Sequence, residues 1–221
     1  MSIAFDATSQ GNSNGSSDYT YDHVCTGSNG YLLVATTVNA TAVTYNSVSL
    51  SLLISYTPTS PPGTNCPGIK VWGLSAPATG TNAILVTAGA DLSVAVSYTG
   101  VLATPVEASS NEDSANNQVS TFSNTVTTIS PNAWRVGFFM GNNNYAQTLT
   151  AGSGTTLRGS RTSFTTGYAI GVMDSNSAIV TPASYTLNNG WTSGSGFMTS
   201  TGISMAPVFP QSSGGFLINF Y

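Results

Sequence analysis

The stretch Leu92-Ser93-Val94-Ala95-Val96-Ser97-Tyr98 decides the fold, because large apolar residues alternate in it with serine and alanine. Alternate side chains of a β-strand lie on opposite faces, so this pattern predicts an antiparallel strand with one buried face and one small polar face. Further segments with a strand pattern are 19–26, 31–38, 42–45, 69–74, 83–86, 118–127, 133–140 and 167–172. Helical periodicity, helical crossovers and fixed-period repeats are all missing from the sequence. It therefore predicts an all-β protein, an antiparallel β-sandwich of jelly-roll type.

The breaks between these segments define the expected organisation. Segment 57–68 is rich in proline and segment 141–144 is polar, so both are expected to be surface loops. The polar stretch 108–117 is the expected internal seam of one domain that spans residues 1–221. Within that domain, residues 207–221 are expected to form a C-terminal hinge and strand.

Composition excludes several partners. Charged residues make up 5% of the 221-residue chain and the formal net charge is -4, while 40% of the residues are hydrophobic. Four basic residues cannot neutralise a run of phosphates, so we expect no nucleic-acid partner. No apolar run is long enough to span a bilayer, and the residues after Met1 lack a secretory signal pattern. We expect no membrane partner, and synthesis in a cytoplasm.

The two cysteines, Cys25 and Cys66, are too few for a disulfide framework and too far apart for a metal-binding pair. Buried free thiols are the main expectation. A bridge between them is the alternative, since it would stabilise a particle in oxidising surroundings.

The first half of the chain contains several short motifs that together carry a family resemblance. They are Ile3-Ala4-Phe5-Asp6-Ala7-Thr8-Ser9, the stretch 21–34, Val43-Thr44-Tyr45-Asn46-Ser47-Val48-Ser49-Leu50, and Ser97-Tyr98-Thr99-Gly100-Val101 followed by Pro105. Together they resemble a β-sandwich module found in phage virion proteins and bacterial surface proteins. In the second half the resemblance rests on Asn132-Ala133-Trp134 and on the strand rhythm. The resemblance implies a structural or adhesive role, without a catalytic motif.

The residues offer little support for catalysis. His23 is the only histidine and follows Asp22, but adjacent strand residues point to opposite faces, so a Ser-His-Asp arrangement is not expected there. The eight acids have no spacing typical of a glycosidase pair. They are Asp6, Asp18, Asp22, Asp91, Glu107, Glu112, Asp113 and Asp174. We expect a protein that is not an enzyme and needs no cofactor.

The loop 111–117 is rich in oxygen ligands that Ca²⁺ accepts, but it lacks the spacing of an EF-hand. A solvated polar loop is the favoured interpretation, and no metal site is predicted.

Two aromatic residues beside polar loops are the glycan-binding candidates, Tyr145 and Trp191. An exposed aromatic ring next to amide and hydroxyl groups is typical of sugar recognition. The alternative is that tryptophans fill the core, which we expect for Trp72 and Trp134 and leave open for Trp191.

The C-terminal segment is the candidate for assembly. Phe216, Leu217, Ile218, Phe220 and Tyr221 form an apolar run after a turn-rich hinge, and such a run needs a docking partner. It either closes its own sheet or pairs with a neighbouring subunit. The low charge points the same way, because charges usually protect exposed sheet edges.

The resemblance implies a phage virion structural protein, such as a capsid decoration or fibre component, made in the host cytoplasm and carried on the particle, whereas composition alone indicates only a neutral β-protein. Its expected partners are other copies of itself, in a homo-oligomer such as a trimer, other virion proteins, and a host surface glycan. The alternative is a carbohydrate-binding or adhesin module of a bacterial surface protein, located outside the cell or on its surface. A polysaccharide-degrading enzyme ranks third.

Overall fold

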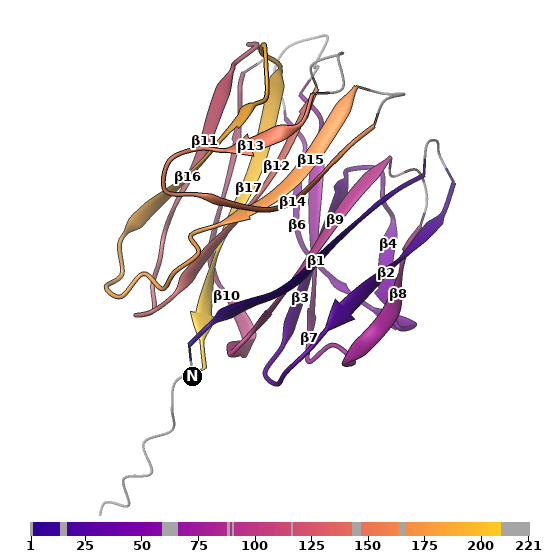
Figure 1. The fold of residues 1–221 in the computed structure, drawn as a ribbon, viewed down its shortest axis with the longest axis vertical. Helices are drawn as coiled ribbons and strands as arrows, with labels where there is room; N and C mark the ends of the chain where they lie inside the picture. The colour runs from indigo at the N-terminus through magenta and orange to yellow at the C-terminus, as the bar shows by residue number, and fades with distance from the viewer. Residues whose placement is uncertain are drawn as a thin grey trace, which may run out of the picture.

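The computed structural model describes residues 2–13, 17–58, 66–87, 89, 91–115, 117–142, 147–163 and 167–208. Every regular element in this part of the chain is a β-strand (Figure 1), which confirms the all-β prediction. The strands of the first half are β1 (Ala4–Asn12), β2 (Tyr19–Cys25), β3 (Tyr31–Thr37), β4 (Ala42–Tyr45), β5 (Val48–Ser49), β6 (Ser51–Tyr56), β7 (Ile69–Ser75), β8 (Gly80–Thr87) and β9 (Leu92–Thr99). The strands of the second half are β10 (Val101–Asp113), β11 (Thr121–Thr127), β12 (Trp134–Asn142), β13 (Leu149–Ala151), β14 (Thr156–Thr162), β15 (Tyr168–Asp174), β16 (Ser184–Trp191) and β17 (Phe197–Pro207).

The strands form four antiparallel sheets, two in each half. The first half has an inner sheet, β1-β9-β3-β7-β6, and an outer sheet, β2-β8-β4-β5. The second half has an inner sheet, β10-β17-β12-β15-β14, and an outer sheet, β11-β16-β13. Each half is thus an antiparallel β-sandwich.

The two sandwiches pack against each other through their inner sheets, giving four layers (Figure 1). The largest core lies between the inner sheets and joins residues of both halves, such as Leu33 and Val96 with Phe138 and Ile203. A second core fills the first sandwich, and a third fills the second sandwich. Both inner sheets are therefore covered on both faces.

The two halves have the same topology. The strands β10 to β17 take, in chain order, the sheet positions of β1, β2, β3, β4, β6, β7, β8 and β9. The short strand β5 has no counterpart in the second half. We call the halves the first and second repeats. The sequences align weakly at the matching places, for example Phe5-Asp6-Ala7-Thr8-Ser9 with Val106-Glu107-Ala108-Ser109-Ser110. Both segments carry a β-bulge at the acid, where the register shifts between Phe5 and Ala7 and between Val106 and Ala108.

Several local expectations need correction. The strand β9 is buried on both faces, because its alanine and serines pack toward the outer sheet of the first repeat instead of facing water. Gly141 and Asn142 still belong to β12, and residues 108–113 belong to β10. The boundary between the repeats is the turn at Gly100, whose φ of 71° favours glycine. The proposed seam at 108–117 is therefore wrong.

Cys25 and Cys66 are both buried and free, which confirms the main expectation for the thiols. Trp72 and Trp134 are buried in the cores, as predicted. No helix in the described part of the chain is long and apolar enough to cross a membrane.

Candidate functional site

The ionisable side chains of the described residues mostly hold strands together. Asp6 sits in the bulge of β1 and accepts hydrogen bonds from Ser97 Oγ at 2.7 Å and from Thr26 N at 2.9 Å. This carboxylate therefore ties β1 to β9 and to the loop that follows β2.

Glu107 does the same work in the second repeat. It accepts from Ser204 Oγ at 2.7 Å and from the backbone N–H groups of Ile129 and Ser130 at 2.9 and 3.0 Å. Burial by itself would raise the pKa of Glu107, but these hydrogen bonds bring the pKa below its ordinary value. The carboxylates of Asp6 and Glu107 thus hold neighbouring segments together at equivalent places in the two repeats.

His23 lies between two serines in the first sandwich. Its Nδ1 is 2.9 Å from Ser9 Oγ and its Nε2 is 3.1 Å from Ser97 Oγ. Asp6 contacts the serine and not the imidazole, which differs from the order of a catalytic triad. In the second repeat Asn124 bonds Ser110 in the equivalent position.

The buried imidazole predicts a specific loss of stability in acid. Burial lowers the pKa of His23 from 6.5 to about 4, and the charge of Asp6 offsets only part of this. The unfolded chain therefore binds a proton between pH 6.5 and 4 that the folded chain does not bind, so stability is complete above pH 6.5 and falls toward pH 4. The loss from this residue should be about 3 kcal/mol. Urea unfolding of the native chain and of His23→Asn at pH 7, 5 and 4 checks this, since the variant should lose less; equal losses would contradict it.

Arg135 is a buried cation without a carboxylate partner in the described structure. Its guanidinium donates to the carbonyl of Ile203 at 2.5 Å and to Asn124 Oδ1 at 2.9 Å, and burial lowers its pKa to about 9. Leu32 occupies the matching position of the first repeat. Arg135 therefore replaces an apolar core residue with a hydrogen-bonded cation, and it faces the interior of the second sandwich.

A second buried network joins the two repeats. Asp174 accepts from Tyr98 Oη at 2.8 Å, from Arg158 Nε at 2.7 Å and from the N–H of Asn176 at 2.9 Å. The guanidinium of Arg158 also lies 4.3 Å from the ring centroid of Phe5. Tyr98 and Phe5 belong to the first repeat, whereas Asp174 and Arg158 belong to the second.

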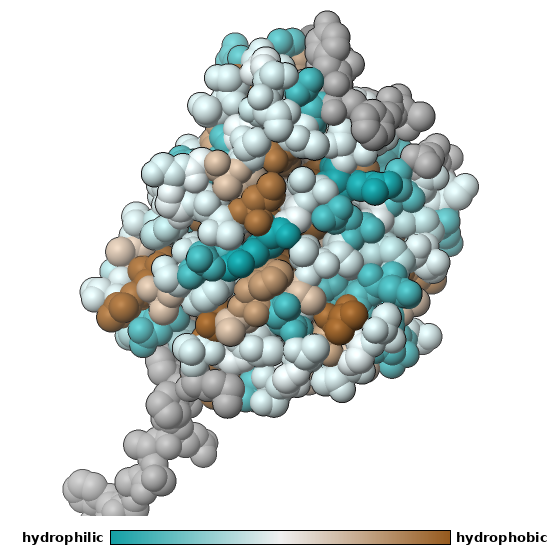
Figure 2. All heavy atoms as spheres, in the orientation of Figure 1, coloured by the Kyte–Doolittle hydropathy of each residue, from teal (hydrophilic) through white to brown (hydrophobic). Residues whose placement is uncertain are grey.

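The face of the molecule drawn in Figure 2 is weakly polar. Figure 2 shows a face of mostly pale side chains, with strongly hydrophilic and strongly apolar patches confined to small areas. Such a surface has few charges with which to recognise a charged ligand.

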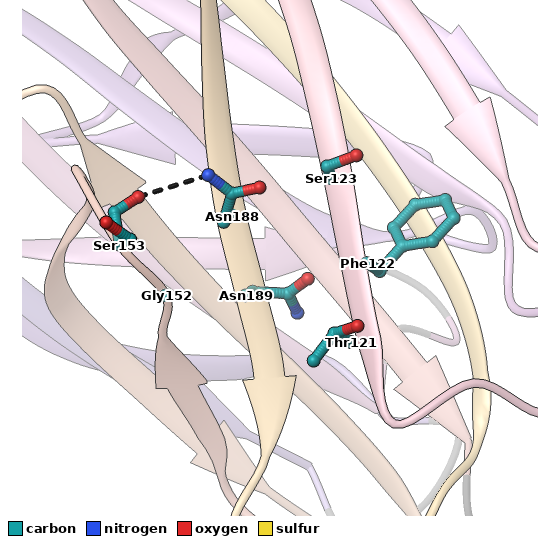
Figure 3. Close-up of a pocket in the computed structure, with 7 residues that line it drawn as sticks. All are labelled: Thr121, Phe122, Ser123, Gly152, Ser153, Asn188 and Asn189. Carbon is teal, nitrogen blue, oxygen red and sulfur yellow. Dashed lines mark hydrogen bonds between the residues drawn. The ribbon is translucent and has the colours of Figure 1, made fainter.

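The outer sheet of the second repeat carries a groove of about 420 Å³. Its lining consists of Thr121, Phe122 and Ser123 of β11, Asn188 and Asn189 of β16, and Gly152 and Ser153 after β13. None of these side chains is charged. In Figure 3 the Asn188 amide nitrogen points to Ser153 and its oxygen points toward β11. The hydrogen bond from Asn188 Nδ2 to the Ser153 carbonyl is 3.1 Å long and fixes this orientation.

Neither glycan-binding residue expected from sequence is among the described residues that line the groove. Trp191 is 7% exposed and packs in the core of the second sandwich, where the absence of a side chain at Gly141 makes room for its ring. It is therefore a core residue, and the expectation of an exposed ring does not hold. Tyr145 lies outside the described residues, as do the assembly candidates Phe216, Leu217, Ile218, Phe220 and Tyr221.

The first three residues of the loop considered for Ca²⁺, residues 111–113, belong to strand β10. Asp113 ends β10 and accepts hydrogen bonds from Tyr56 Oη and from the N–H of Ala115. In the described ranges no three His, Cys, Asp or Glu side chains come together in a way that could hold a metal ion.

Sequence analysis missed the groove because its residues are small, neutral and spread over three segments. The available signal was the alternation of Thr121, Ser123, Thr125 and Thr127, which gives β11 a hydroxyl-bearing face. That pattern shows the face and not the hollow, which depends on pairing with β16.

Comparison with known proteins found no matching family model, no matching curated protein and no matching solved structure. The structure itself defines the class. The chain is a duplicated antiparallel β-sandwich with a neutral polar groove on one outer sheet.

Proposed function

We propose that this protein is a structural component of a phage particle surface, such as a decoration or fibre protein, that acts by assembling with copies of itself and with neighbouring virion proteins. Its motifs resemble the virion module in the first half, and the second half repeats the same topology. The use of the half-buried carboxylates of Asp6 and Glu107 to tie strands together also favours a role in structure over catalysis. Made in the host cytoplasm, it is proposed to reside on the virion.

The observation that carries the assembly proposal is the edge strand β6. Its sequence Ser51-Leu52-Leu53-Ile54-Ser55-Tyr56 has no charge and no proline, and Leu52 is 47% exposed. The matching edge strand of the second repeat, β14, carries Arg158 and Arg161 instead. An uncharged apolar edge offers unpaired backbone groups to another chain, so it favours β-pairing between subunits.

A charge on this edge should prevent association. We expect Leu52→Lys to shift the protein toward monomer, lowering the self-association constant at least about tenfold, because a desolvated lysine opposes strand pairing. Sedimentation equilibrium measures the constant. Val180→Lys is the matched control, since Val180 is 69% exposed but lies in a loop of the second repeat. Equal association of all three proteins would refute the role of β6.

The alternative, a carbohydrate-binding or adhesin module of a bacterial surface protein, is favoured by one observation. The lining of the groove carries no charge and is rich in hydroxyl and amide groups.

A further inference from the structure

The strands β11 and β16 carry pairs of polar side chains facing each other on the outer face of the sheet. At one end, the closed end, these side chains hydrogen-bond to each other, whereas at the end beside the groove, the open end, they do not. At the closed end Thr125 pairs with Thr186 at 2.7 Å and Thr127 pairs with Ser184 at 2.8 Å between side-chain oxygens. At the open end Thr121 lies opposite Gly190, which has no side chain.

The partner of Ser123 across the strands is Asn188. The nitrogen of the Asn188 amide is held by Ser153, so its Oδ1 faces β11 (Figure 3). The open end therefore presents two hydroxyl groups and an amide oxygen to a ligand lying on the sheet.

The first repeat shows which changes opened this space. The hydrogen bonds of His23 to Ser9 and of Asn124 to Ser110 align β2 with β11, so Thr20 corresponds to Thr121. The residues paired with these two threonines are Leu85 and Gly190, which therefore occupy equivalent positions. A leucine side chain on the outer face has thus become a glycine. Restoring bulk would crowd the sheet slightly, since a Cβ at Gly190 lies 3.1 Å from the Ser120 carbonyl oxygen.

The same comparison reveals a costly residue beside the groove. Asn189 occupies the position of Ile84, a core residue of the first repeat, and Ala151 occupies that of Tyr45. Asn189 is 1% exposed, and neither Nδ2 nor Oδ1 has a hydrogen-bond partner among the described residues. An unpartnered buried amide costs about 1–3 kcal/mol, so its presence where the other repeat has isoleucine indicates a role other than stability.

The chemistry of the groove selects the ligand. With no charged side chain in the lining, a charged ligand would lose its hydration without gaining an opposite charge. Thr121, Ser123 and Asn188 offer hydrogen-bonding groups on the outer face of the sheet, which match the hydroxyl groups along the edge of a sugar ring. The Phe122 side chain lies on the other face of β11 and packs against the core, so it supports the floor of the groove. An extended peptide would instead pair with a strand edge.

We propose that the groove of the outer sheet of the second repeat binds a neutral oligosaccharide, with Ser123 and Asn188 contacting its hydroxyl groups and Gly190 providing the room. Trp191, a glycan-binding residue expected from sequence, does not line this groove. The proposal does not depend on self-assembly, because the groove lies within one chain.

Saturation-transfer difference NMR followed by calorimetric titration tests this site. The probes are chitotetraose, maltohexaose, cellohexaose and a β-1,4-linked galactotetraose, with tetragalacturonate as a charged comparison. We expect at least one neutral probe to bind the native chain and the charged one not to bind. Gly190→Leu, which restores the residue of the first repeat, should abolish binding. Ser123→Ala combined with Asn188→Ala should weaken binding about tenfold through the lost hydrogen bonds.

Thr125→Ala is the matched control, because Thr125 lies on the same face of β11 outside the groove lining. Thermal unfolding of each variant shows whether it is folded, and the double alanine variant, which adds no bulk, keeps the test valid if Gly190→Leu fails to fold. The proposal is overturned if no neutral probe binds the native chain at millimolar concentration. It is also overturned if both folded groove variants bind as the native chain does.

Discussion

Replacing Asp174 by alanine is expected to lower the free energy of unfolding by about 3–5 kcal/mol, since breaking a buried ion pair leaves its other members unpaired. Asp174 is 0% exposed and receives three hydrogen bonds, from Tyr98, Arg158 and Asn176. Burial raises the pKa of Tyr98 well above its usual value, and the nearby Asp174 carboxylate raises it further, so this phenol remains a donor. Loss of Asp174 would leave that donor buried without an acceptor.

Urea unfolding followed by circular dichroism measures this loss. Asp22→Ala is the control, because Asp22 is an exposed acid on β2 and its removal should change stability by no more than about 0.5 kcal/mol. Asp174→Asn keeps one acceptor oxygen and should fall between the native chain and the alanine variant. A loss below about 1 kcal/mol for Asp174→Ala would show that the network does not join the repeats in solution.

Trp191→Ala should cost about 3–5 kcal/mol, the range for removing a large aromatic side chain from a core. The indole packs with Leu149 and Met198 between the inner and outer sheets of the second repeat, and the residue at the matching position of the first repeat is the buried Val86. The neighbouring Gly141 has no side chain that could move into the space left by the ring. The same urea titration measures the change.

Trp191→Phe provides the comparison for that variant. It keeps an aromatic ring in the core, so we expect a loss of about half that of the alanine variant. It should also leave oligosaccharide binding by the groove unchanged, because Trp191 does not line it. If Trp191→Ala left stability unaltered and abolished glycan binding, the ring would be an exposed binding platform, and its placement in the core would be wrong.

The sequence predicts strands where one face is apolar. Segments such as Leu92–Thr99 and Ala42–Tyr45 can be predicted as strands because β-branched and aromatic residues alternate in them with small ones. The strand β17 escaped prediction although it lies inside a sheet, since Ser200, Gly202 and Ser204 interrupt its apolar pattern. In the fold these positions face buried polar groups, for example Asn124 beside Ser200. Buried polarity of this kind depends on partners distant in sequence.

The duplication was hidden for a related reason. The repeats keep their topology and their bulge acids, but Leu32 matches Arg135 and Ile84 matches Asn189, so equivalent core positions differ in polarity. Unequal loops also prevent a fixed period. The candidate site follows from those differences, because it lies where large side chains of the first repeat, such as Leu85, correspond to small ones of the second repeat, such as Gly190. A single sequence pattern cannot show such a loss before the repeats are superposed by strand pairing.

The central claim, that this protein works by assembling, is tested most directly by the mass of the purified full chain in solution, measured by multi-angle light scattering at tens of micromolar. A trimer or larger oligomer is the predicted result, and a version ending before Phe216 should have a smaller mass because it lacks the apolar C-terminal run that is expected to pair with a neighbouring subunit. A monomer at every concentration, for the full chain, would contradict self-assembly.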